Sequence, residues 1–143
     1  MTIEAVLAGK GGDVATVEPG ATLAQAAAEL ARRRIGALVV VDPTGAVIGI
    51  ISERDVVQCV ATRGGVALES PVADAMTPDV ITVARGTSVL GALSVMTDKR
   101  IRHLPVVEGG RLAGIVSIGD LVALRLAKIE AEAEAMRAYI QAS

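Results

Sequence analysis

The chain has 143 residues, of which 52% are hydrophobic and 21% are charged, and its formal net charge is -2. This length and composition indicate one soluble globular domain with a real core, and they argue against a disordered chain. Because Tyr139 is the only aromatic residue and the net charge is negative, both the stacking platforms and the basic surface typical of nucleic-acid binding are disfavoured.

The sequence carries no sign of export or membrane insertion. Its longest uninterrupted apolar run, residues 37–41, is too short to cross a bilayer, and residues 1–5 lack the pattern of a secretory signal. Cys59 is the only cysteine, so no internal disulfide can form, which fits a reducing compartment. We therefore expect a cytoplasmic protein without a membrane partner.

The sequence repeats itself after about 66 residues, and each copy predicts the order β-α-β-β-α behind a short helical lead. The first copy predicts a lead helix over 3–7, a strand over 14–17, a helix over 23–33, strands over 38–41 and 47–51, and a helix after Ser52. The second predicts a lead helix over 72–76, a strand over 80–83, a helix over 88–99, strands over 104–107 and 112–116, and a helix after Ser117. The strands are apolar and β-branched, and Thr22, Ser52 and Ser117 precede helices as N-caps.

A duplicated unit of this size predicts a pseudo-symmetric pair. We expect an α/β (α+β) fold in which two tandem β-α-β-β-α repeats pack as a pseudo-two-fold module with an extended C-terminal helix. Residues 1–63 are assigned to the first repeat with its N-terminal lead helix, and residues 72–143 to the second repeat. Residues 64–71 form the linker between them and contain a flexible Gly pair.

The final helix is predicted to run from Asp120 to about Gln141, well beyond its counterpart in the first copy. Its apolar residues follow a 4-3-4-3-4 spacing, which is the pattern of a heptad seam, and they are Val122, Leu126, Ile129, Ala133, Met136 and Ile140. Two interpretations stay open. The helix either packs back on its own domain or forms a homodimer contact through this seam.

Conventional catalytic and metal-binding constellations are missing from the sequence. His103 is the only histidine and no cysteine cluster exists, so the usual ligands of a zinc site are absent. A phosphate loop of the Gly-x-x-x-x-Gly-Lys-Ser/Thr type does not occur either. We therefore expect a protein that is not an enzyme, with no metal and no catalytic cofactor.

Both copies instead place Ser-x-x-Asp where a buried strand meets a helix, as Ser52 with Asp55 and Ser117 with Asp120. Backbone N–H groups at such a junction favour anions, and an Asp carboxylate suits the two vicinal hydroxyls of a ribose. The same residue types also form a variant of the helix capping box. Ribose binding and simple capping therefore both remain open.

The repeat resembles a tandem pair of CBS domains, which are named for cystathionine β-synthase. The resemblance covers the chain from about Ile3 to the last helix, and its motifs match at 35–41, 49–55, 101–107 and 114–122. It implies two clefts that take adenosine-containing ligands such as AMP, ADP, ATP, NAD or S-adenosylmethionine. The positions that the resemblance implies for nucleotide binding are Thr82, Val83, Arg102, His103, Ser117, Asp120, Thr16, Val17, Ala37, Ser52 and Asp55.

The resemblance also implies a role for each position. Each Ser-x-x-Asp holds a ribose, Arg102 and His103 meet phosphate, and the first strands at 16–17 and 82–83 read the adenine edge. Gly36 and Ala37 replace the Arg-His pair in the first copy, so we expect unequal clefts, with that of Asp120 the better phosphate binder. Basic residues at 32–34, 54 and 99–100 either compensate in the first copy or lie at solvated helix ends.

The function that the resemblance implies is a regulatory sensor of adenine nucleotides. It would stand alone and act in trans on an unknown partner protein, as a homodimer. The alternative is a structural or oligomerisation module in which Ser-x-x-Asp only caps helices. A small nucleotide-using enzyme is a third interpretation, and it lacks catalytic groups.

Overall fold

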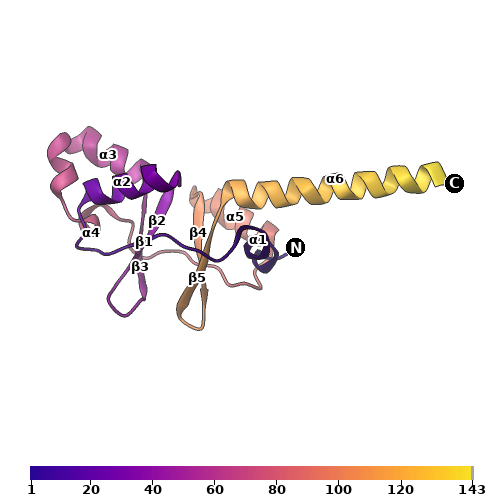
Figure 1. Ribbon diagram of the computed structural model, residues 1–143, viewed down its shortest axis with the longest axis horizontal. Coiled ribbons are helices and arrows are strands. Elements are labelled where there is room, and N and C mark those ends of the chain that lie inside the picture. The colour runs from indigo at the N-terminus through magenta and orange to yellow at the C-terminus, as the bar shows by residue number, and fades with distance from the viewer. Residues whose placement is uncertain (143) are drawn as a thin grey trace.

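The two sequence repeats form two neighbouring lobes in the computed structural model, which describes residues 1–142 (Figure 1). The helices are α1 (Ile3–Lys10), α2 (Leu23–Arg33), α3 (Glu53–Arg63), α4 (Val72–Ala75), α5 (Val89–Lys99) and α6 (Ile118–Ala142), with a 3-10 helix η1 (Gly65–Glu69). The strands are β1 (Thr16–Val17), β2 (Ala37–Val41), β3 (Val47–Ser52), β4 (His103–Glu108) and β5 (Arg111–Ser117). The predicted α/β class is confirmed, and so is the element order except for the strand predicted over 80–83.

Each lobe is built on a small sheet. In the first lobe β2 pairs antiparallel with β3 and parallel with β1. In the second lobe β4 pairs antiparallel with β5, and Val83 alone forms a parallel bridge to Val106. The strand predicted over 80–83 is therefore wrong over most of its length, because Val80 and Ile81 line a cavity instead of joining the sheet.

The predicted N-caps explain why the helices begin where they do. The Thr22 hydroxyl accepts a hydrogen bond from the backbone N–H of Gln25 at 3.1 Å, and Oε1 of Gln25 accepts one from the Thr22 backbone N–H at 2.9 Å, which completes a capping box. Ser88, which the sequence placed inside its helix, is instead the N-cap and accepts from the backbone N–H of Gly91 at 2.9 Å. Replacing such a cap by Ala typically costs about 1 kcal/mol, so each junction is fixed locally.

Each lobe takes the lead helix of the other repeat into its core. Ile3 of α1 is fully buried in the second core with Leu104, and its N–H donates to the Thr87 carbonyl at 2.9 Å. Val72 of α4 is fully buried in the first core, and its N–H donates to the Ala21 carbonyl at 2.7 Å. The boundaries at 63 and 72 stay a prediction, but the N-terminal lead helix packs with the second lobe instead of the first.

Helix α6 extends far from both lobes (Figure 1). Leu121 is its only buried residue, and the exposed fractions of the seam residues Val122, Leu126, Ile129, Met136 and Ile140 are 42, 54, 45, 59 and 64%. The interpretation that this seam packs back on its own domain is therefore wrong. Among residues 1–142, no helix combines the length and apolarity needed to cross a membrane.

Candidate functional site

A cavity of about 400 Å³ lies where the two repeats face each other, and its size suits a small organic ligand. The first repeat contributes the end of β3 and the start of α3, and the second contributes the segments before and after α5. The lining residues are Gly36, Ile50, Ser52, Glu53, Arg54, Asp55, Thr77, Asp79, Val80, Ile81, Arg100, Ile101, Arg102 and His103.

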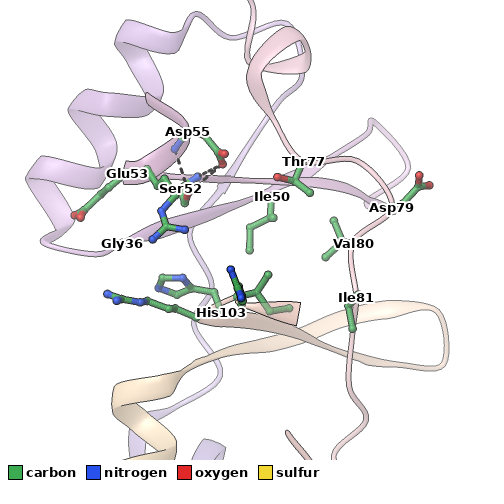
Figure 2. Close-up of a pocket in the computed structure, with 14 residues that line it drawn as sticks. Gly36, Ile50, Ser52, Glu53, Asp55, Thr77, Asp79, Val80, Ile81 and His103 are labelled. Atoms are coloured by element: carbon green, nitrogen blue, oxygen red, sulfur yellow. Dashed lines mark hydrogen bonds between the residues drawn. The ribbon is translucent and has the colours of Figure 1, made fainter. Parts of the chain in front are cut away.

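The junction between β3 and α3 presents Ser52 and Asp55 to one side of this cavity (Figure 2). Oδ2 of Asp55 accepts from the Ser52 backbone N–H at 2.9 Å and from the Ser52 hydroxyl at 3.0 Å. The Asp55 N–H donates to the Ser52 hydroxyl oxygen at 3.3 Å, which completes a capping box. Within residues 1–142, Oδ1 of Asp55 takes part in no hydrogen bond, so capping leaves a carboxylate oxygen for a ligand.

Three arginines at the cavity, Arg54, Arg100 and Arg102, lack an anionic partner. In the part of the chain that the structure describes, none of them forms an ion pair or a side-chain hydrogen bond. Guanidinium groups bind phosphate in bidentate geometry, so a phosphate ester is the partner that this set suits best. Arg54 and Arg100 thus lie at the cavity. This position agrees with the interpretation that they compensate for the missing Arg-His pair of the first copy.

The arginines at 32–34 do not reach this cavity. Arg32 and Arg33 bind Glu29 of their own helix, at 3.0 and 2.8 Å. For these two residues the solvated helix end is the correct interpretation.

His103 lies across the cavity from Ser52 and Asp55 (Figure 2). Burial lowers the pKa of its imidazole below the usual 6.5, and this effect outweighs the opposing attraction of Asp120. The ring also depends on Gly36, since a Cβ atom at that position would lie 3.1 Å from both Cε1 and Nε2 of His103. The glycine that removes a basic residue from the first copy therefore makes room for the histidine of the second.

The remaining wall of the cavity is mostly apolar. Val80 and Ile81 form it together with Ile50 and Ile101, and Thr77 exchanges two backbone hydrogen bonds with Ile50, at 2.9 and 3.1 Å. This wall offers an apolar group of a ligand a surface to pack against. It is the part of the site that sequence reasoning missed, because the segment read as a continuous strand.

The positions predicted to read adenine lie elsewhere. Val83 is buried in the second core, and Thr82 lines a separate surface hollow with Val107 and Gly110. Thr16 and Val17 form β1 and do not line the cavity. Ala37, a further predicted site residue, starts β2 with only 5% exposure and does not line the cavity either.

The carboxylate of the second Ser-x-x-Asp, Asp120, already forms an ion pair with Lys10. The Lys10 ammonium donates to Oδ2 of Asp120 at 2.7 Å and to the Ile115 carbonyl at 2.9 Å, and the Ser117 N–H donates to the same Asp120 oxygen at 2.9 Å. Burial alone would raise the pKa of the Asp120 carboxyl, but the hydrogen bonds from Lys10 and Ser117 hold it below its usual value. Helix α1 has eight residues where α4 has four, and Lys10 is its last residue.

The sequence assigned Arg102 and His103 to the cleft of Asp120, and His103 does lie opposite Ser117 of that junction in the β4–β5 register. Arg102 and His103 nevertheless both line the cavity of Asp55, which belongs to the other repeat. The Arg102 backbone stays at its own junction, where its carbonyl accepts from the Ile118 N–H at 2.8 Å. The lobes face each other, so the residues just before β4 also border the β3–α3 junction. The Asp55 cavity is thus the cationic one.

The sequence is similar to those of known proteins. The family model described as "CBS domain" matches the chain twice, over residues 11–62 and 72–127. An uncharacterised 17.7 kDa protein of Acidianus ambivalens is 44% identical over 109 residues, which cover 76% of this chain and 65% of the relative. The match thus spans less than two thirds of that curated relative's length.

Solved structures share the fold. The CBS-domain-containing protein ATU1752 from Agrobacterium tumefaciens has a TM-score of 0.84 at 44% identity, covering 87% of this chain and 92% of that one. The CBS domain pair of protein MJ0100, in complex with methylthioadenosine and S-adenosyl-L-methionine, has a TM-score of 0.80 at 26% identity, covering 90% and 98%. CBSX2 in complex with AMP has a TM-score of 0.71 at 25% identity, covering 82% and 90%.

Proposed function

Because this chain belongs to the CBS domain family, we propose that it is a regulatory, non-catalytic module that binds one adenine nucleotide in the cavity beside Asp55. The observation that carries the proposal is the set of unpaired arginines, Arg54, Arg100 and Arg102, at the cavity that also holds the free carboxylate oxygen of Asp55. The related CBS pairs MJ0100 and CBSX2 were solved with adenosine-containing ligands, which supports the adenosine part. The proposal includes a cytoplasmic homodimer that regulates an unidentified protein in trans.

Each wall of the cavity has a role in this proposal. Oδ1 of Asp55 accepts hydrogen bonds from the ribose hydroxyls, while Val80 and Ile81 cover the adenine. The arginines hold the phosphate, which favours AMP, ADP, ATP or NAD over S-adenosylmethionine. Since both repeats contribute residues, a bound nucleotide would stabilise one relative placement of the lobes over another, which is the differential affinity that a sensor needs.

Calorimetry with AMP, ATP, NAD, adenosine and S-adenosylmethionine tests the proposal. Phosphate-bearing ligands are expected to bind more tightly than adenosine, and Arg102→Ala should reduce that difference about tenfold, as expected for losing one charge-assisted hydrogen bond. Arg33→Ala is the matched control, because Arg33 binds Glu29 outside the cavity. Equal affinity for adenosine and AMP would contradict the phosphate role, and no binding by any of these ligands would contradict the whole proposal.

The number of binding sites is a second prediction. Wild-type protein is expected to bind one nucleotide per chain, because Lys10 already pairs with Asp120, while Arg102 and His103 line the Asp55 cavity. The stoichiometry of the same titrations measures this directly. Two equivalent nucleotides per chain would show that Lys10 yields to ligand.

Binding is also expected to depend on pH through His103. Its pKa is lowered in the free protein, so the imidazole is neutral at pH 7, and a phosphate would favour the protonated form. Affinity for AMP should therefore rise as pH falls from 7.5 to 6, by about threefold more in wild type than in His103→Gln. Comparing the two proteins cancels the titration of AMP itself. Parallel pH profiles would rule out this role of His103.

The lowered pKa of His103 also makes the stability of the fold depend on pH, in the opposite direction to the affinity for AMP. An unfolded histidine binds a proton below about pH 6.5, whereas the folded protein binds it only at lower pH. The contribution of His103 to the free energy of unfolding is therefore present at neutral pH and is lost as the pH falls below about 6.5. The groups whose charges act on it are Asp120, Lys10, Glu53 and Arg102. A stability gain on acidification would contradict this assignment.

A structural or oligomerisation module without a physiological nucleotide is the second candidate. The observation that favours it is that Ser52 and Asp55 form a complete capping box without any ligand. It becomes the better account if Ser52→Ala and Asp55→Ala lower stability and no adenine ligand binds.

A further inference from the structure

The exposed seam of α6 lies largely outside the part of the chain that matches the family. The second family match ends at residue 127, whereas α6 continues to Ala142. Beyond that point the helix still presents Ile129, Met136 and Ile140, which are 45, 59 and 64% exposed. Apolar residues in a continuous row on a projecting helix indicate a contact surface, because isolated exposure would not produce a regular spacing.

The spacing of the seam defines what kind of partner it fits. Val122, Leu126, Ile129, Ala133, Met136 and Ile140 alternate steps of four and three, so they occupy the two core positions of a heptad. Such a seam packs against another helix with the same period. Within residues 1–142 no other element covers the seam. Helix α6 projects from the second lobe, so most of the seam lies away from both lobes (Figure 1).

The charges beside the seam favour a second copy in parallel orientation. In a parallel, in-register pair, the residue at heptad position g, just before core position a, faces the residue at position e five places later in the partner helix. Arg125 then faces Glu130, and Glu132 faces Arg137, so both contacts join opposite charges, twice over by symmetry. In the antiparallel pair with full overlap of the seam, Glu130 and Glu132 would each meet their own copy, which is repulsive.

We propose that two copies of this chain associate through a parallel, in-register coiled coil formed by the α6 seam from Val122 to Ile140. Ala133 is the only small residue of the seam, and it lies among larger apolar side chains. The four flanking ion pairs set orientation and register, as such pairs do in coiled coils. The association uses none of the cavity residues and therefore goes beyond the nucleotide proposal.

The mass of the intact protein in solution, measured by light scattering over a range of micromolar concentrations, tests the interface. Wild type is expected at the mass of two chains and Ile129→Asp at the mass of one. Ala131→Asp is the matched control, since it adds the same charge to an exposed helical position outside the seam and should remain a dimer. Thermal unfolding and nucleotide titration of each variant show that the lobes are intact.

Crosslinking tests the orientation. In a Cys59→Ser background, Ala133→Cys should form an interchain disulfide on mild oxidation, because residue 133 meets its own copy only in the parallel register. Glu132→Arg should weaken the dimer, and adding Arg137→Glu should restore it.

A monomeric wild type, a larger assembly, or a dimer insensitive to Ile129→Asp would overturn the proposal. A seam-dependent dimer without the 133–133 crosslink would overturn its parallel register. Failure of the interface and failure of nucleotide binding remain distinguishable, because mass and calorimetry are measured on the same samples.

Discussion

Asp55→Ala is expected to lose about 100-fold in affinity for AMP, or roughly 2.7 kcal/mol, as two hydrogen bonds to a charged carboxylate disappear. The carboxylate is suited to this role because all of its bonds within the chain go to Oδ2. Asp120→Ala is the symmetry-related control, and it should leave affinity within about threefold, since Lys10 holds that carboxylate. Calorimetry on the three proteins measures both effects.

Ser52→Ala separates ligand binding from helix capping. It removes the hydroxyl that accepts from the Asp55 N–H, so it should cost about 1 kcal/mol of stability while leaving the Asp55 carboxylate in the cavity. If Ser52→Ala and Asp55→Ala weaken AMP binding equally, the carboxylate has no special role. An Asp120→Ala protein that loses binding as much as Asp55→Ala would reverse the assignment of the two junctions.

Ile3→Ala is expected to destabilise the second lobe by about 2 to 5 kcal/mol, although Ile3 precedes the first repeat in the sequence. The side chain is fully buried in the core that contains Leu104 and Val116. Urea unfolding gives the free energy, and Val66→Ala, at a side chain that is 58% exposed, should change it by less than about 0.5 kcal/mol. A loss below about 1 kcal/mol would mean that α1 is not an integral part of that core.

Local features of the fold were predictable from sequence because the same pattern occurs in both repeats. The strands at 37–41 and 47–52 and their counterparts at 103–108 and 111–117 follow from apolar β-branched runs, and the caps at Thr22, Ser52 and Ser117 follow from local hydrogen bonding. These interactions join residues that are close in the chain. The repeat period then gives the same answer independently in both copies.

Long-range partners were not predictable in the same way. A repeat shows that Arg102 corresponds to Gly36, but it does not show which junction each of them faces when the lobes meet. The contact of Lys10 with Asp120 spans 110 positions and depends on one extra turn of α1. Of the predicted site residues, the structure brings Ser52, Asp55, Arg102 and His103 together, while Val80, Ile81 and Arg100 are added only by three-dimensional packing.

The exchanged lead helices also determine the order in which the protein can form during synthesis. The first core is incomplete until Val72 has left the ribosome, and α1 has no core of its own until Leu104, Val116 and Leu121 exist. Closing a loop of this length has an entropic cost, and such non-local contacts slow folding. The apolar face of α1 therefore stays unburied on the nascent chain while nearly all of the module is translated, which makes this helix the segment with the longest exposure to chaperones and proteases.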